Sequence, residues 1–306
     1  MDFIPSDQDD RAIDTPERQA AAKKSTLISV VVNLLLTVSQ VVAGVLTHSQ
    51  GLIADGIHSL SDLIADFVVL LANRHSGKDA DEDHHYGHQR YETAASLVLG
   101  LLLLAVGVGM LWAAAGKLQT PDQIAPVQIA ALWVALAALV AKELLFRYML
   151  AVAERVRSTM LVANAWHARS DAASSLVVAI GIGGSLLGLP ILDPIAALIV
   201  GFMVGKMGWS FAWDALHDLM DRAASDEQVA QIRALIAGTP GVLGMHDLKT
   251  RKMGDMILVD VHLEVDPELN VRASHAITVE ARRRVMAALP VLGVMTHVDP
   301  HGEDDD

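Results

Sequence analysis

The sequence predicts an α-helical membrane protein of six transmembrane helices, followed by a small cytoplasmic α/β domain. Two observations lead to this prediction. First, 52% of the 306 residues are hydrophobic and the mean hydropathy is +0.38, which is too apolar for an ordinary soluble domain. Second, long apolar segments alternate with short charged loops as far as Trp213, whereas the residues after Asp221 have the composition of a soluble domain.

The six spans are predicted in order along the chain. The first is Leu27–Leu46, which lies in a stretch without charged residues and is long enough to cross a core of about 30 Å. The other five follow at Leu52–Asn73, Thr93–Gly116, Ile124–Met149, Ala163–Leu189 and Pro194–Trp213. Proline suits the first turn of a helix, so Pro194 marks the start of the last span.

Lysine and arginine in the short loops predict the orientation of these spans. They gather on one side of the membrane, at Arg18, Lys23, Lys24, Arg74, Lys78, Arg90, Arg147, Arg155 and Arg157. The opposite loops offer only Lys117. Because basic loops stay in the cytoplasm, both termini are predicted to be cytoplasmic.

The soluble part predicts the element order αββαβ. Ser225 caps a first helix, and the second strand alternates apolar and polar residues. The elements are expected at Asp226–Ala237, Leu243–Arg251, Met256–Val265, Val271–Ala288 and Val291–Val298. The chain thus divides into a disordered cytoplasmic tail (1–22), a membrane domain (23–216), a cytoplasmic metal-binding α/β domain (217–300) and an acidic tail (301–306).

Composition limits the chemistry that the chain can perform. The absence of cysteine excludes disulfides and thiolate metal sites, so any metal must be held by histidine and carboxylate groups. A net charge of −13 argues against nucleic acid as a partner. The thirteen histidines, against three tyrosines and five phenylalanines, are many for a chain of this kind.

Two patterns of the same form, His58-xxx-Asp62 and His167-xxx-Asp171, lie inside the second and fifth predicted spans. An ionisable side chain at membrane depth costs roughly 2.5–3.5 kcal/mol and is usually functional. Residues four apart share one face of a helix, so each pair offers one imidazole nitrogen and one carboxylate oxygen. Together they make four ligands, the number that a tetrahedral divalent metal takes. The alternative is hydrogen bonding between helices, which a repeated pattern makes less plausible than a metal site.

The same patterns predict a mechanism. Histidine must be neutral and aspartate ionised to bind metal, so a site that opens alternately to each side exchanges a divalent ion for protons. Asp55 and Asp66 extend the acidic stripe on the second span, and Asn164 lies one turn before His167. These three residues are candidates for the ion path. Because they add oxygen ligands near the site, Mn²⁺, Fe²⁺, Co²⁺ and Cd²⁺ are also possible substrates.

With these motifs in place, the chain after residue 22 resembles the cation diffusion facilitator family of dimeric metal-ion/proton antiporters, especially its bacterial zinc and ferrous-iron efflux members. The resemblance implies that the transport site consists of His58, Asp62, His167 and Asp171. Some relatives carry aspartate at the position of His58, and the resemblance implies that this choice shifts metal preference. A set of two histidines and two aspartates is the zinc-favouring version.

The resemblance also implies sites outside the membrane. A loop site of the form DxxHxxxH consists of Asp81, His84 and His88, although His85 leaves the frame open and a solvated charged loop is an alternative. A binuclear cytoplasmic site that joins two protomers has its ligands at His246, His262, His275, His297 and Asp299. Arg90 and Asp221 match a basic–acidic pair of the family, which usually has lysine where Arg90 stands.

The motifs and the resemblance together predict an exporter of Zn²⁺ in the bacterial inner membrane, with Fe²⁺, Cd²⁺ and Co²⁺ as further substrates. The resemblance further implies a homodimer with zinc also in structural or regulatory sites. The alternative is a membrane-bound metal-sensing or assembly protein that binds metal without moving it. An ATP-driven pump is disfavoured because the sequence has no GxxxxGK[ST] motif. A carrier of organic cations lacks the aromatic cage it would need, and no nucleophile–base pair suggests an enzyme.

Overall fold

The computed structural model describes the backbone of residues 16–76, 78, 80–155 and 159–302. The side chains of residues 16–22, 66, 69, 70, 73, 74, 159, 160, 163, 164 and 167 lie outside the description. Two compact units emerge: the chain up to Phe67 together with Leu101–Trp209, and Val68–Gly100 together with the chain from Ser210. Each unit is described by itself below.

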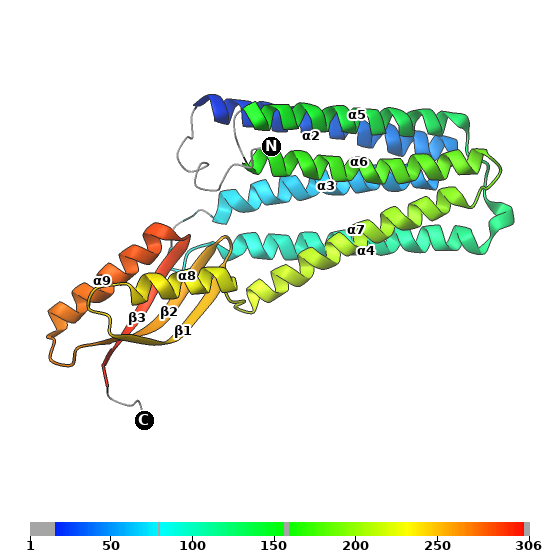
Figure 1. Ribbon diagram of the computed structural model, residues 1–306. Coiled ribbons are helices and arrows are strands. Elements are labelled where there is room, and N and C mark those ends of the chain that lie inside the picture. The colour runs from blue at the N-terminus through cyan, green and yellow to red at the C-terminus, as the bar shows by residue number, and fades with distance from the viewer. Residues whose placement is uncertain (1–15, 77, 79, 156–158, 303–306) are drawn as a thin grey trace. The chain divides into compact units, whose positions relative to one another are not determined.

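Long helices make up the first unit (Figure 1). In the described part of the chain the long helices are α2 (Pro16–Thr47), α3 (Gln50–Ser76), α4 (Arg90–Gln119), α5 (Ile129–Arg155), α6 (Thr159–Leu186) and α7 (Leu192–Leu219), with a short 3-10 turn, η1, at Pro121–Gln123. The part of α3 after Phe67, the part of α4 before Leu101 and the part of α7 after Trp209 belong to the second unit. Each predicted span corresponds to one of these helices. The helical membrane domain is therefore confirmed.

Four helices are long and apolar enough to cross a membrane by length and composition, within the residues that the structure describes. They are Lys23–Thr47 of α2, and α4, α5 and α7. Helices α3 and α6, which carry the two His-xxx-Asp patterns, are not among these four, and several of their side chains lie outside the described part of the structure. The count of six spans is not confirmed and stays a prediction.

The ends of all six long helices differ from the predicted span ends, and the starts of α2 and α5 have a local physical reason. Helix α2 begins at Pro16, so residues 16–22, which we expected in the tail, are helical; proline at the first position and the alanines that follow favour this. Helix α5 begins at Ile129 instead of Ile124. Pro126 disfavours the helical conformation of the preceding Ala125, so a helix that starts at Ile124 is unfavourable.

The helices of the first unit pack through small and branched side chains. Leu52, Val178, Ile182 and Val200 belong to its main buried cluster, which α2 to α7 all border or enter. Helices α4 and α7 touch at their backbones: a Cβ atom on Gly107 would lie 2.5 Å from the Cα of Gly205. Contacts of this kind are typical of helices that associate in a bilayer.

The second unit contains the soluble domain. Its sheet has the order β1 (Gly244–Met253), β2 (Met256–Val265), β3 (Val291–Pro300), with β1 antiparallel and β3 parallel to β2. Helices α8 (Asp226–Ala237) and α9 (Val271–Ala288) complete the domain. The predicted order αββαβ is confirmed, and the Ser225 side chain accepts a hydrogen bond from the backbone N–H of Gln228, as expected of a cap.

Strand β2 has one buried face and one partly exposed face. Its apolar residues, among them Val259, Val261 and Leu263, are almost fully buried in a core that α8 and α9 share. Because side chains alternate along a strand, the intervening His262 and Glu264 lie on the face away from that core. The sheet therefore leaves one polar face free of the helices.

Candidate metal centres

The first cluster lies in the helical unit, between α3 and α6. One ligand atom from each of His58, Asp62 and Asp171 lies within 4.8 Å of the other two. His58 Nδ1 is 3.5 Å from Asp62 Oδ2, and the two side chains are only 7% and 15% exposed. One imidazole and two carboxylates thus converge at a distance that one divalent ion can bridge. We refer to these residues as the membrane cluster.

Three predicted residues near this cluster have side chains outside the described part of the structure. His167 precedes Asp171 by one turn of α6, so its backbone position is on the face that carries Asp171. Asp66 lies on α3 and Asn164 on α6. The fourth ligand and these two ion-path residues therefore stay predictions.

Asp55, the remaining ion-path candidate, is surrounded by protein donors and is 1% exposed. Ser174 Oγ donates to its Oδ1 at 2.8 Å, Ser175 Oγ donates to its Oδ2 at 2.6 Å, and Gln40 Nε2 donates to Oδ2 as well. Lys142 Nζ lies 3.4 Å from Oδ1. This carboxylate therefore contacts α2, α5 and α6, and residue spacing alone did not predict these contacts.

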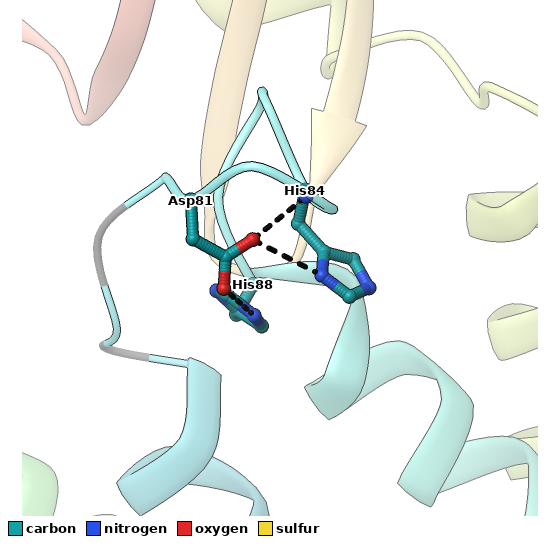
Figure 2. Close-up of side chains that lie close together, drawn as sticks. All are labelled: Asp81, His84 and His88. Carbon is teal, nitrogen blue, oxygen red and sulfur yellow. Dashed lines mark hydrogen bonds and ion pairs between the residues drawn. The ribbon is translucent and has the colours of Figure 1, made fainter.

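The second cluster lies in the loop before α4 and consists of Asp81, His84 and His88, which we call the loop cluster. Figure 2 shows both oxygens of Asp81 in use: Oδ1 accepts from the backbone N–H of His84 at 2.8 Å, and Oδ2 lies 3.3 Å from His88 Nε2. His84 Nδ1 is 3.4 Å from Oδ1. The backbone hydrogen bond from His84 is the main reason why the pKa of Asp81 is lowered.

The structure brings together Asp81, His84 and His88, which is the DxxHxxxH set that the resemblance implied. His85 is not part of the loop cluster. Next to it, a cavity of about 530 Å³ is lined by His85, Arg90 and Arg251, among other residues of the second unit. Arg90 also donates to Asp221 Oδ1 through Nη2 and lies 3.4 Å from the carbonyl oxygen of Leu219 through Nη1. The predicted pair of Arg90 and Asp221 is thus in contact.

The third cluster lies on the polar face of the sheet. His246 pairs with His262 across β1 and β2, and His262 pairs with His297 across β2 and β3, so the three rings form a row. Asp299 joins them: its Oδ2 lies 3.1 Å from His262 Nδ1 and 3.5 Å from His246 Nε2, and its Oδ1 lies 3.2 Å from His297 Nε2. We call these four residues the sheet cluster. His275, the fifth predicted ligand, is exposed on α9.

Two residues that lie beside the sheet cluster were not predicted from the sequence. Glu264 lies 3.2 Å from His246 Nδ1 through Oε1 and 2.7 Å from His301 Nδ1 through Oε2. These hydrogen bonds, His301 first, lower the pKa of Glu264. Glu264 and His301 each follow a predicted ligand by two positions, and this strand period could have identified them.

Comparison with known proteins identifies the family. Residues 26–220 match the family described as "Cation efflux transmembrane domain", and residues 224–301 match "Cation efflux protein, cytoplasmic domain". Metal tolerance protein C1 of Arabidopsis thaliana is 36% identical over 280 residues, which cover 87% of this chain and 59% of that protein. The manganese efflux system protein MneS of Bacillus subtilis is 33% identical over 287 residues, which cover 93% of this chain and 98% of that protein.

Among solved structures, the metal-bound C-terminal domain of the CzcD transporter from Thermotoga maritima is 25% identical, with a TM-score of 0.25. It corresponds to 26% of this chain and 93% of that domain. The match to the transmembrane domain alone covers more than half of the 306 residues. The chain therefore belongs to the cation diffusion facilitator family, whose members are membrane-embedded metal efflux transporters and not enzymes.

Proposed function

We propose that this protein exports a divalent metal cation, Zn²⁺ above others, from the cytoplasm across a bacterial inner membrane in exchange for protons. The observation that carries the proposal is the convergence of His58, Asp62 and Asp171 between two helices of the membrane domain. Ionisable groups at such a place are costly unless they serve a purpose. His167 completes the site as its fourth ligand.

Proton exchange follows from the chemistry of the ligands. Metal binding requires neutral imidazole and ionised carboxylate, so a site open to the cytoplasm releases protons as it loads. On the other side of the membrane, protonation of the same groups expels the metal. A helix bundle that opens alternately to each side turns this competition into antiport.

The donor atoms favour Zn²⁺. Imidazole suits zinc better than manganese, which prefers sites made of oxygen atoms. Mn²⁺ is the second candidate, because the chain is 33% identical to a manganese efflux protein over nearly the full length of both. Fe²⁺, Co²⁺ and Cd²⁺ are further substrates to be compared.

We further propose that the loop cluster and the sheet cluster bind zinc in structural or regulatory roles, with His275 as a further ligand of the cytoplasmic site. The protein acts as a homodimer with both termini in the cytoplasm. Its domains are the tail (1–22), the membrane domain (23–216), the cytoplasmic domain (217–300) and the acidic tail (301–306). The two family matches, at 26–220 and 224–301, support this division.

Flux measurements in proteoliposomes test the function. The purified protein is reconstituted with an imposed proton gradient, and uptake of Zn²⁺, Mn²⁺, Fe²⁺, Co²⁺ and Cd²⁺ is measured together with internal pH. We expect Zn²⁺ to give the highest ratio of maximal rate to KM, with proton flux in the opposite direction. Asp171→Ala should abolish both fluxes, whereas Glu154→Ala, which removes an exposed carboxylate at the end of α5, should leave them unchanged.

Three results would decide against parts of the proposal. Unchanged flux in Asp171→Ala would remove the membrane cluster as the transport site. Metal binding without metal-dependent proton flux would favour the sensing or assembly alternative. A higher ratio for Mn²⁺ than for Zn²⁺ would replace the substrate but keep the mechanism.

A further inference from the structure

Lys142 is the only buried lysine or arginine among the residues that the structure describes. It lies on α5 and is 2% exposed, and its Nζ is 3.4 Å from Asp55 Oδ1 and 3.3 Å from the carbonyl oxygen of Asp171. A buried ammonium group is expensive to desolvate, and its attraction to one carboxylate does not always repay that cost. The pair therefore needs an explanation beyond stability.

The position of the Lys142–Asp55 pair beside the membrane cluster suggests such an explanation. Asp55 precedes His58 by one turn of α3, and Ser174, which donates to Asp55, follows Asp171 by one turn of α6. The pair thus connects the two helices of the membrane cluster directly beside the ligands. Lys142 reaches the backbone of one ligand residue itself.

A charge count shows what the pair does for metal binding. The described ligands of the membrane cluster carry two negative charges, from Asp62 and Asp171, which match one divalent cation. Ionised Asp55 alone would add a third negative charge next to the site. Lys142 alone would add a positive charge that repels the cation.

We propose that Lys142 and Asp55 are positioning residues that form a neutral clamp between α3, α5 and α6, so that the transport ligands alone set the charge that a divalent cation meets. This inference rests on the proposed transport function. It assigns Asp55 to the support of the site and not to the ion path. Neither residue touches the metal in this assignment.

Zinc flux by three variants tests the clamp. Asp55→Asn leaves the ammonium group unbalanced, and we expect KM for Zn²⁺ to rise about tenfold or more with a smaller change in maximal rate. Lys142→Gln removes the positive charge, so KM should not rise. The double variant Asp55→Asn/Lys142→Gln is neutral again and should return KM to within about threefold of the wild-type value.

A purely structural role predicts a different pattern, because both single variants would then be impaired alike and the double variant would be worse. That pattern would overturn the proposal, as would a double variant that cannot be purified in folded form, since a neutral pair of similar shape should fold. If one single variant fails to fold, the other single variant and the double variant still decide. Absence of zinc flux in the wild-type protein would instead refute the transport function itself.

Discussion

The membrane cluster and the sheet cluster use the same ligand types in opposite surroundings. His58 and Asp62 are 7% and 15% exposed on helices, whereas His262 is 36% exposed and His297 is 66% exposed on a sheet. In the first, ligands meet because residues four apart share a helix face; in the second, because paired residues of adjacent strands share a sheet face. Buried ligands suit an ion that must pass through, and exposed ligands suit an ion that arrives from solution and stays.

The largest difference between the two clusters should appear when one carboxylate is neutralised in each. Asp62→Asn replaces an ionised carboxylate of the membrane cluster with a neutral amide, a much weaker metal ligand. We expect zinc flux to fall by about 100-fold or more, since the loss of even an indirect partner of a bound metal costs about 10–100-fold. Asp299→Asn removes the shared carboxylate of the sheet cluster and should change flux by less than about threefold. Proteoliposome flux at matched protein density measures both variants.

Equal losses of flux in these two variants would contradict the division of roles. Such equal losses would mean that metal at the sheet cluster is required for transport. Asp247→Asn, which changes an exposed carboxylate on the same strand as His246 but outside the cluster, serves as the matched control.

Much of the fold could be predicted from the sequence, because it depends on local patterns. The alternation of β2 and the cap at Ser225 specify their elements within a few residues. The two His-xxx-Asp patterns could be recognised because their spacing is that of a helix turn. The start of α2 was harder, since a polar helix end and a polar tail have similar composition.

The surroundings of the site could not be predicted in the same way. From the sequence, Lys142 is interpreted as part of the polar end of a span. Only the packing of α5 against α3 and α6 places its ammonium group beside Asp55. Ser174 and Ser175 carry no signal of their own in an apolar segment. Contacts between distant segments depend on the tertiary structure, which residue spacing alone does not encode.

A medium effect is expected when the sheet cluster loses an imidazole. Zinc bound to His246, His262 and Asp299 should stabilise this face by about 2.7 kcal/mol at 100 times the dissociation constant. Hydrogen–deuterium exchange of β2 and β3 in the full-length protein should therefore slow when zinc is added. His262→Ala should remove this slowing, whereas His217→Ala, which changes a histidine of α7 outside the three clusters, should preserve it.

The smallest effect is expected at Glu280 on α9, which belongs to none of the three clusters. On α9, Arg283 and Arg284 donate to Glu280, and these hydrogen bonds lower the pKa of its carboxyl group from 4.5 to about 2. A lowered pKa in the folded state means that ionised Glu280 stabilises the fold above pH 4.5, and that this contribution disappears as the pH falls towards 2. The Glu280 side chain is 34% exposed and its ion pair with Arg283 is screened by solvent, so the contribution is small.

Glu280→Gln should therefore lower the melting temperature slightly at pH 7, and the difference from the wild-type protein should shrink below pH 4.5. Thermal unfolding followed by circular dichroism, with and without EDTA, measures this difference in melting temperature. The difference should be the same in both conditions, because Glu280 belongs to none of the three clusters and is not among the proposed ligands. A difference that depended on metal would show that α9 and the sheet cluster are coupled, and the two sides of the domain could then not be treated as independent.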